Sequence, residues 1–217
     1  MRVVASLLAV ALLVAAPPAS AQSRSAHGKL FAPLDLGLLE GPDRDLWQLP
    51  GQIMDALGVA EGSVVADIGA GAGWFTIRLA RRVGPNGIVH SEDIQPQMLE
   101  ATGRRVSKEG LRNVRTVRGT ADDPKLPPGA LDAVLVVDTY HEIEYPEALL
   151  RNIATSLKPQ GRVGVVDFKK DGLGPGPALE DRVDPDVIVR DAEAAGLKLV
   201  RRETFLPYQF LLIFARK

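Results

Sequence analysis

The sequence predicts an α/β fold, a doubly wound sheet of seven mixed strands that closes with a C-terminal antiparallel hairpin. Short apolar segments rich in β-branched residues alternate with segments of helical periodicity along most of the chain. Residues 131–137 are apolar at nearly every position, which is typical of a strand buried on both faces of a parallel sheet. The last two strand-like segments are separated only by Leu206, Pro207 and Tyr208, and so short a connection requires an antiparallel pair.

The first 21 residues have the layout of a secretory signal peptide. Arg2 precedes an apolar run that ends at Pro17, and Ala19-Ser20-Ala21 offers a small-residue cleavage site before Gln22. The run is shorter than the ~20 residues that a membrane-spanning helix needs. We therefore expect cleavage after Ala21, export to the periplasm or out of the cell, and no stable membrane anchor in the mature chain.

Residues 22–43 read as an irregular lead-in to one domain that spans residues 44–217. The domain begins with a helical segment over 44–57, which we expect to be interrupted near Pro50 and Gly51. Strands are expected at residues 64–68, 88–93, 114–118, 131–137, 162–168, 197–205 and 209–215. The helices between them are expected at residues 74–83, 95–108, 150–157 and 185–195, and a loop rich in Gly and Pro covers 169–182.

The composition argues against disulfides, a lipid anchor on cysteine, nucleic acid binding and a metal site. The chain has no cysteine, so neither a disulfide nor a lipidated N-terminal cysteine is available. Loss of residues 1–21 removes one basic side chain, Arg2, from the 26 in the chain, and leaves 25 against 27 acidic ones. This balance, without any charged block, gives no indication of nucleic acid binding. The three histidines lack the spacing of metal ligands, so we expect no metal site.

A glycine-rich loop follows the first expected strand. Asp67 closes that strand, and Gly69, Gly71 and Gly73 stand at every second position before a helix begins. Glycine lets the backbone turn sharply and approach a ligand closely, and a helix N-terminus adds unpaired N–H groups. Such a unit is typical of a nucleotide-cofactor site in a Rossmann-like sheet. The spacing differs from the G-x-G-x-x-G of dinucleotide-binding proteins.

Two further segments are expected beside the same cofactor. Asp93 ends the second strand and can accept both hydroxyls of a ribose, with Ile94 beside it, although it could instead cap the following helix. By sheet order, the end of the third strand lies next to the nucleotide. The candidates there are Thr120, Ala121 and Asp122, with an Asp-rich turn as the alternative.

The end of the fourth strand carries the candidate catalytic groups. Asp138 is placed to hold the amino group of a cofactor, and Tyr140 to shape the pocket or take part in catalysis. His141 titrates near neutrality and is a candidate general base. The alternative for His141 is a structural histidine that caps the next helix. We expect the acceptor pocket to combine Tyr140 and His141 with the loop after Phe168 and the hairpin tip at Tyr208.

The D-x-G-x-G-x-G pattern resembles motif I of the class I S-adenosylmethionine (SAM)-dependent methyltransferases. Beyond this motif, the segments 43–48, 89–99, 137–141, 165–170 and 205–210 are similar to a family of small predicted methyltransferases, several of which look exported. The resemblance implies SAM as cofactor, the class I fold, and a lead-in segment with Trp47 that folds over the cofactor. Trp47 could equally pack the N-terminal helix onto the domain. Thr120 departs from the Gly-Asp-Ala that many members have at this place.

The chemistry implied by this resemblance is an in-line transfer of a methyl group to a small-molecule acceptor. In such a reaction the protein mainly aligns the reactants, and a base such as His141 helps where the acceptor must lose a proton. Two alternatives stay open. A non-catalytic SAM- or nucleoside-binding protein is compatible with the export signal, because SAM is made in the cytoplasm. An NAD(P)-linked oxidoreductase is disfavoured by the glycine spacing and by the lack of a Tyr-x-x-x-Lys motif.

Overall fold

The computed structural model describes residues 30–32 and 41–217. The expected signal peptide and most of the lead-in lie outside these residues. No helix in the described part of the chain is long and apolar enough to cross a membrane.

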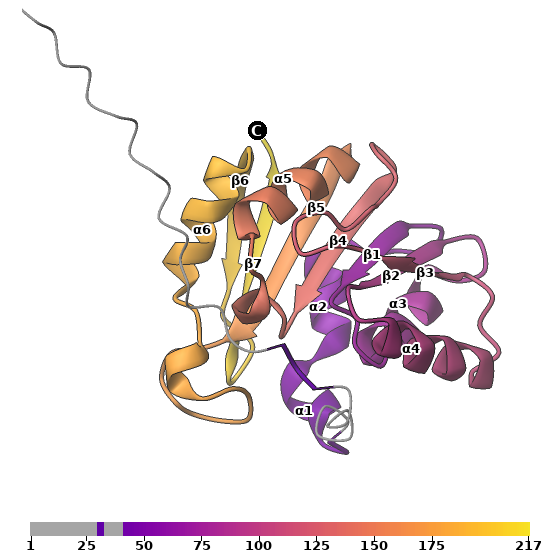
Figure 1. The fold of residues 1–217 in the computed structure, drawn as a ribbon, viewed down its shortest axis with the longest axis horizontal. Coiled ribbons are helices and arrows are strands. Elements are labelled where there is room, and N and C mark those ends of the chain that lie inside the picture. The colour runs from indigo at the N-terminus through magenta and orange to yellow at the C-terminus, as the bar shows by residue number, and fades with distance from the viewer. Residues whose placement is uncertain (1–29, 33–40) are drawn as a thin grey trace, which may run out of the picture.

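A single seven-stranded sheet forms the centre of the molecule (Figure 1). Its order is β3-β2-β1-β4-β5-β7-β6, in which the first five strands are parallel and β7 is antiparallel to both β5 and β6. The predicted fold class is therefore confirmed. The strands are β1 (Val64–Ile68), β2 (Ile88–Asp93), β3 (Val114–Arg118), β4 (Leu131–Val137), β5 (Leu157–Phe168), β6 (Leu197–Glu203) and β7 (Gln209–Arg216).

Helices cover both faces of the sheet. They are α1 (Arg44–Gln48), α2 (Pro50–Ala56), α3 (Trp74–Val83), α4 (Pro96–Lys108), α5 (Pro146–Ser156) and α6 (Pro185–Ala194), with 3-10 turns η2 (Tyr140–Glu142) and η3 (Leu179–Asp181). Leu49, which has a left-handed φ of 47°, separates α1 from α2. The expected interruption thus falls one residue earlier than predicted. Pro50 disfavours helical geometry at the residue before it and is itself well suited to begin a helix.

Alternate residues of β4 belong to different apolar clusters. Val134 and Val136 pack with residues of α5 and α6 on one face of the sheet. Leu135 and Val137 pack with residues of α2 and α3 on the other face. Because both faces of this central strand are covered, its sequence can be apolar almost throughout.

Strand β5 begins earlier than the sequence predicts. The preceding helix ends at Ser156, and the chain continues in extended form through Pro159, which we expected to lie before the strand. The pairing of β5 with β4 shifts between Leu131 and Ala133, so the proline stands where the regular ladder is interrupted. Proline lacks an N–H group, and irregular positions of this kind are where a sheet tolerates it.

The strand order reverses between β1 and β4, and the functional segments gather where these strands end. The glycine-rich loop after β1, helix α1 and the loop of residues 169–182 all lie toward this carboxyl edge of the parallel strands (Figure 1). Open α/β sheets bind ligands at this position.

Candidate active site

Two adjoining cavities open at the carboxyl edge of the sheet. The inner cavity, of about 330 Å³, is lined by the glycine loop and by the ends of β1, β2 and β4. The outer cavity, of about 800 Å³, is lined by α1 and by the loop of residues 169–182. Both are lined by Phe31, Arg44, Asp138 and Glu142, so these four residues mark the boundary between the cavities.

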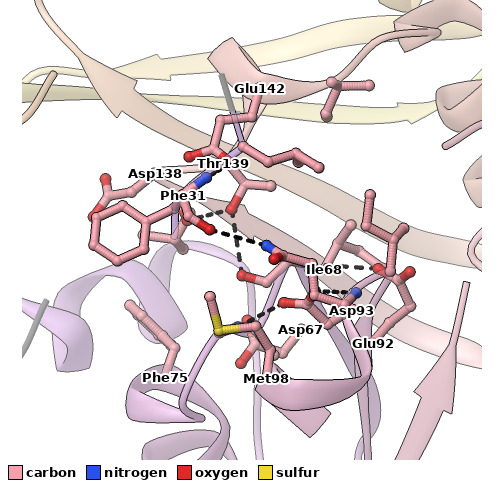
Figure 2. Close-up of a pocket in the computed structure, with 18 of the residues that line it drawn as sticks. Phe31, Asp67, Ile68, Phe75, Glu92, Asp93, Met98, Asp138, Thr139 and Glu142 are labelled. Carbon is pink, nitrogen blue, oxygen red and sulfur yellow. Dashed lines mark hydrogen bonds between the residues drawn. The ribbon is translucent and has the colours of Figure 1, made fainter. Parts of the chain in front are cut away.

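Most of the residues expected around a cofactor line the inner cavity. Figure 2 shows Thr139 and Glu142 on one side of it and Asp93 and Met98 on the other. The expected residues found in its wall are Asp67, Gly69, Gly71, Asp93, Ile94, Thr120, Ala121 and Asp138. Backbone groups and carboxylates therefore form much of the polar surface that a ligand would meet.

The glycine loop has a conformation that other residues rarely adopt. Gly69, Gly71 and Gly73 have φ values of 64°, 54° and 78°. A Cβ on Gly69 would overlap the side chain of Thr139. Thr102 fixes the loop from α4, because its hydroxyl donates a 2.8 Å hydrogen bond to the carbonyl oxygen of Gly71. Glycine is suited to these positions because it can adopt a left-handed φ and has no Cβ to collide with neighbouring side chains.

Two buried carboxyls connect the ends of β1 and β2 to the glycine loop and to helix α3. Asp93 accepts hydrogen bonds from the backbone N–H groups of Gly71 (3.0 Å) and Gln95 (2.8 Å). Asp67 accepts a 2.6 Å hydrogen bond from the hydroxyl of Thr76 in α3. Burial raises the pKa of Asp93, and it raises the pKa of Asp67 to about 7. A cationic ligand in the cavity would favour the ionised form of both groups.

Glu92, next to Asp93, is a buried carboxyl with an unusual environment. Its Oε2 accepts a long hydrogen bond of 3.4 Å from the N–H of Gly69. Its Oε1 has no hydrogen-bond partner, the single case among buried side-chain N and O atoms of the described residues. Burial first, and then the charge of Asp93, raise the pKa of Glu92 to about 8. Glu92 is consequently expected to be largely protonated at neutral pH.

Asp138 stands at the centre of a buried polar network between the two cavities. Its Oδ2 accepts hydrogen bonds from Arg44 (3.0 Å) and Gln48 (2.9 Å), and its Oδ1 accepts one from Gln209. Asp138 has a left-handed φ of 54°. The network links helix α1 to the ends of β4 and β7. It therefore determines where the N-terminal helix lies over the inner cavity.

Aromatic and proline side chains form much of the outer cavity. The ring of Trp47 lies 6.2 Å from the ring centroids of both Phe168 and Tyr208. Pro175 and Pro177 of the 169–182 loop complete this wall. The outer cavity thus offers a large, mostly apolar space beside the polar boundary residues.

His141 brings a titratable group to the outer cavity. Its Nδ1 lies 3.1 Å from both carboxylate oxygens of Asp167, at the end of β5, and its Nε2 lies 3.8 Å from Oε1 of Glu142. Burial lowers the pKa of His141, but the hydrogen bond and charge of Asp167, with Glu142 and Asp138, outweigh this effect and raise it overall. A histidine oriented by a carboxylate at one nitrogen is suited to accept a proton at the other.

Comparison with known proteins shows what the domain that carries this site is similar to. Residues 65–161 match a family model described as a methyltransferase domain. A solved structure of a SAM-dependent methyltransferase from Aquifex aeolicus superimposes with a TM-score of 0.81 at 28% sequence identity, over 85% of this chain and 98% of that one. The chain therefore has the fold of this solved methyltransferase, and residues 65–161 are similar to a methyltransferase domain.

Curated relatives of this domain include ubiquinone/menaquinone biosynthesis C-methyltransferases, UbiE. The enzyme from Pasteurella multocida is 34% identical over 128 residues, which are 56% of this chain and 46% of the relative. The enzyme from Pseudomonas fluorescens is 32% identical over 134 residues, 61% of this chain and 52% of the relative. The chain thus spans about half the length of the curated relatives that it matches.

Four of the residues expected in the site do not line the inner cavity. Gly73 precedes α3 and does not line the inner cavity. Asp122 is exposed, and its carboxylate accepts a 2.7 Å hydrogen bond from the hydroxyl of Thr120 within the turn. Trp47 lines the outer cavity instead of the inner one. Tyr140 is fully buried, its hydroxyl donates to Asp191 of α6, and it lines neither cavity.

Three residues that the sequence analysis did not single out are central to the site: Arg44, Gln209 and Asp167. Each acts through a contact with a residue 26 to 94 positions away along the chain. A signal for Asp167 was present, because a carboxylate follows the apolar residues 163–166 as Asp138 follows the apolar end of β4. No comparable local signal marks Arg44, which belongs to a five-residue helix.

Proposed function

We propose that this protein transfers a methyl group from SAM to a small-molecule acceptor. The observation that carries the proposal is the arrangement of two cavities that meet at Asp138 and Glu142. One cavity is built from the glycine loop and buried carboxyls, and the other has aromatic walls and a histidine. A transfer between two bound molecules requires two such compartments in contact.

The charges in the wall of the inner cavity are suited to SAM. Six carboxyl side chains and one guanidinium, that of Arg44, are in its wall. SAM carries a sulfonium, an ammonium and a carboxylate, so its net positive charge would compensate carboxyls that burial now destabilises in their ionised form. The backbone at Gly69 and Gly71 leaves room for close approach. When bound, SAM supplies a methyl group on a sulfonium with a neutral thioether as leaving group.

Several residues would hold the cofactor in this cavity. Asp93 is placed to accept the ribose hydroxyls, and Asp138 the amino group. Ile94, Thr120 and Ala121 would surround the base. These assignments follow from the position of each residue at the end of its strand.

His141 supplies proton transfer on the acceptor side. Asp167 holds the Nδ1 edge of its ring, so Nε2 is the nitrogen available to take a proton from an acceptor in the outer cavity. A positioned base contributes roughly 10²–10⁴-fold where the nucleophile must be deprotonated. Because the curated relatives are named C-methyltransferases, we infer a carbon nucleophile made reactive by loss of a proton.

The test is a calorimetric titration of the protein with S-adenosylhomocysteine, with NAD as control ligand. We expect micromolar binding of S-adenosylhomocysteine and no binding of NAD. Gly71→Val should abolish binding, because Gly71 lines the inner cavity and has a left-handed φ of 54°, which a β-branched residue rarely adopts. Gly103→Val, where a Cβ meets open space, serves as the matched control.

Catalysis needs a second measurement. Transfer of labelled methyl from SAM to a panel of phenols, quinols and amines would identify the acceptor. Binding of S-adenosylhomocysteine without transfer to any acceptor would instead support a non-catalytic SAM-binding protein. A protein that binds neither S-adenosylhomocysteine nor NAD would contradict the proposal.

A further inference from the structure

Close packing holds the aromatic wall of the outer cavity in place. The plane of the Trp47 ring is inclined by 43° to that of Phe168 and by 61° to that of Tyr208. The loop rich in Gly and Pro packs directly on two of these rings, because a Cβ on Gly174 would overlap Tyr208 and a Cβ on Gly176 would overlap Phe168. The three rings therefore form a preorganised surface against which a flat apolar group can pack.

The same rings are suited to a positively charged group. The face of an aromatic ring is the negative part of its quadrupole, so an ammonium group over Trp or Tyr is stabilised. Trp47 and Tyr208 line the outer cavity and are half-buried, so part of each ring is open to a ligand. Phe168 already has a cationic neighbour, since the guanidinium carbon of Arg182 lies 5.3 Å from its ring centroid. The open surface of Trp47 and Tyr208 thus offers a place for an organic cation.

The charged side chains in the wall of the outer cavity act in the same direction. Four carboxyl side chains and one guanidinium line it, and the guanidinium, that of Arg44, is paired with Asp138 at 3.0 Å. Glu142 accepts a hydrogen bond from a backbone N–H group. The other two carboxyls belong to Asp43, at the N-cap of α1, and Asp181, in η3. Both are exposed and form no ion pair within the described part of the chain.

The basic side chains of the loop do not offset these carboxylates. Arg182 donates to carbonyl oxygens of the loop itself, and Nζ of Lys169 donates to those of Leu206 (2.8 Å) and Pro207 (3.0 Å). Neither basic residue lines the outer cavity. A carboxylate on a ligand would therefore meet other carboxylates and ring faces, and its binding would be disfavoured by both.

We propose that the acceptor is an aromatic compound with a positively charged alkylamine, and that acceptors with a carboxylate are rejected. This inference rests on the proposed function, because it concerns the acceptor in the outer cavity. The ring of the acceptor packs against Trp47 and Tyr208, and the amine is held by these ring faces and by the carboxylates of Asp43 and Asp181. A cavity of about 800 Å³ accommodates both groups of such a molecule. The amine serves for recognition, whereas the carbon that receives the methyl group is the one that reaches His141.

The experiment compares three phenols that share a ring and differ in the charge of the side chain: tyramine, 4-ethylphenol and 3-(4-hydroxyphenyl)propionate. Their affinities for the full chain are measured by ligand-observed NMR titration, with and without S-adenosylhomocysteine. We expect tyramine to bind roughly five- to tenfold more tightly than 4-ethylphenol, and the propionate to bind more weakly than both. The preference for tyramine should shrink at high salt, because exposed charges are then screened.

Substitutions assign the preference to particular residues. Asp43→Asn combined with Asp181→Asn should reduce the preference for tyramine over 4-ethylphenol to roughly two- to threefold, which the ring faces alone account for. Trp47→Leu should weaken tyramine binding more than 4-ethylphenol binding, because it removes a ring face as well as apolar contact. Glu180→Gln is the matched control, since Glu180 is the exposed neighbour of Asp181 and does not line the outer cavity. This variant should keep the wild-type preference.

The outcomes separate this inference from the proposed function. If the propionate binds as tightly as tyramine while S-adenosylhomocysteine also binds, the inference is overturned and the proposed function stands. A preference for tyramine that is unchanged in the combined Asp43 and Asp181 variant would likewise overturn the inference alone. A protein that binds tyramine but not S-adenosylhomocysteine would overturn the proposed function, and the outer cavity would then not be an acceptor site.

Discussion

The imidazole of His141 is fixed by Asp167 through two different groups. Nδ1 of the ring lies 3.1 Å from each carboxylate oxygen, and the backbone N–H of His141 donates to the same carboxylate at 3.2 Å. Asp167 is fully buried and also accepts a 2.8 Å hydrogen bond from the N–H of Phe168. The carboxylate therefore determines both the position of η2 and the orientation of the ring.

This arrangement predicts unequal effects of substitutions on turnover and on cofactor binding. His141→Gln removes the proton acceptor and should lower kcat by roughly 10²–10⁴-fold if the acceptor must be deprotonated. Asp167→Asn should lower kcat by at least about tenfold, because it weakens the hold on the ring. Neither residue lines the inner cavity, so the affinity for S-adenosylhomocysteine should stay within about threefold of the wild type.

A pH profile tests the same assignment. The pKa of His141 is raised overall because Asp167, Glu142 and Asp138 outweigh the effect of burial. The rate should therefore increase with pH through a value above the ordinary 6.5 of histidine, as the ring becomes neutral. Stability should have the opposite dependence, since the protonated ring stabilises the fold below pH 6.5 and this contribution is lost as pH rises through the raised pKa. His141→Gln should remove this step from the rate profile and reduce the pH dependence of stability.

Glu92→Gln should stabilise the protein increasingly as pH rises. The pKa of Glu92 is 4.5 in the reference state and about 8 in the fold, because burial and Asp93 disfavour the charge. Between pH 4.5 and about pH 8, the Glu92 carboxyl is ionised in the unfolded chain but still protonated in the folded chain. The stability contribution of Glu92 therefore falls as pH rises through this range.

Urea denaturation at several pH values measures this effect. The variant should be equal to the wild type below pH 4.5 and more stable near pH 8, by on the order of a few kcal/mol. Glu61→Gln, at an exposed surface position, is the control. A difference between Glu92→Gln and the wild type that does not depend on pH would contradict the prediction.

Gly69 and Thr139 should show strong energetic coupling. A Cβ on Gly69 would overlap the Thr139 side chain, so Gly69→Ala should cost more than the ~1 kcal/mol of left-handed strain alone. In a Thr139→Ala background, Gly69→Ala should cost at least about 1 kcal/mol less, a coupling that a double-mutant cycle measures. Gly58→Ala shares a left-handed φ of 71° but meets open space, so Thr139→Ala should not change its cost.

The parts of the fold that the sequence predicts are those specified by local pattern. The glycine loop, the buried strand β4 and the closing hairpin each need only a few neighbouring residues to be recognised. The start of β5 could not be predicted in this way. Pro159 is an ordinary strand terminator by local preference, and it is tolerated there because the pairing with β4 shifts register between Leu131 and Ala133.

In the candidate site too, the residues that could be predicted are those marked by a local pattern. The place of Asp93 in the cavity wall follows from its position at the end of a strand, 20 residues after the glycine loop. The position of helix α1 depends instead on contacts that Gln48 makes with Asp138 and Gln209, 90 and 161 residues away. For that reason the sequence leaves open whether Trp47, which lines the outer cavity, covers the cofactor or packs the N-terminal helix, and it does not identify Arg44.

The N-terminal sequence predicts export, and this is tested in a bacterial host that expresses the chain with its own N-terminus. Arg2, the apolar run after it and Ala19-Ser20-Ala21 should direct secretion and cleavage, since they supply the three regions of a signal peptide. N-terminal sequencing of the protein from the periplasm or medium should therefore begin at Gln22. Protein found only in the cytoplasm and beginning at Met1 or Arg2 would show that this prediction is wrong.

The loop of residues 169–182 depends on one buried guanidinium. Arg182 donates hydrogen bonds to the carbonyl oxygens of Lys169 (2.9 Å), Leu173 (3.1 Å), Pro175 (3.2 Å) and Pro177 (3.1 Å). A loop with this composition and exposure has little apolar packing of its own, so these bonds hold it against the outer cavity.

Arg182→Met should release the loop without affecting the inner cavity. We expect faster tryptic cleavage after Lys170 and a several-fold higher KM for the acceptor, because an opened loop no longer completes the outer cavity wall. The affinity for S-adenosylhomocysteine should be unchanged, since no residue of this loop lines the inner cavity. Arg190→Met, at an exposed position on α6, is the control. Equal cleavage rates in Arg182→Met and Arg190→Met would mean that Arg182 does not hold the loop in place. Loss of S-adenosylhomocysteine binding in Arg182→Met would mean that the two cavities do not behave independently.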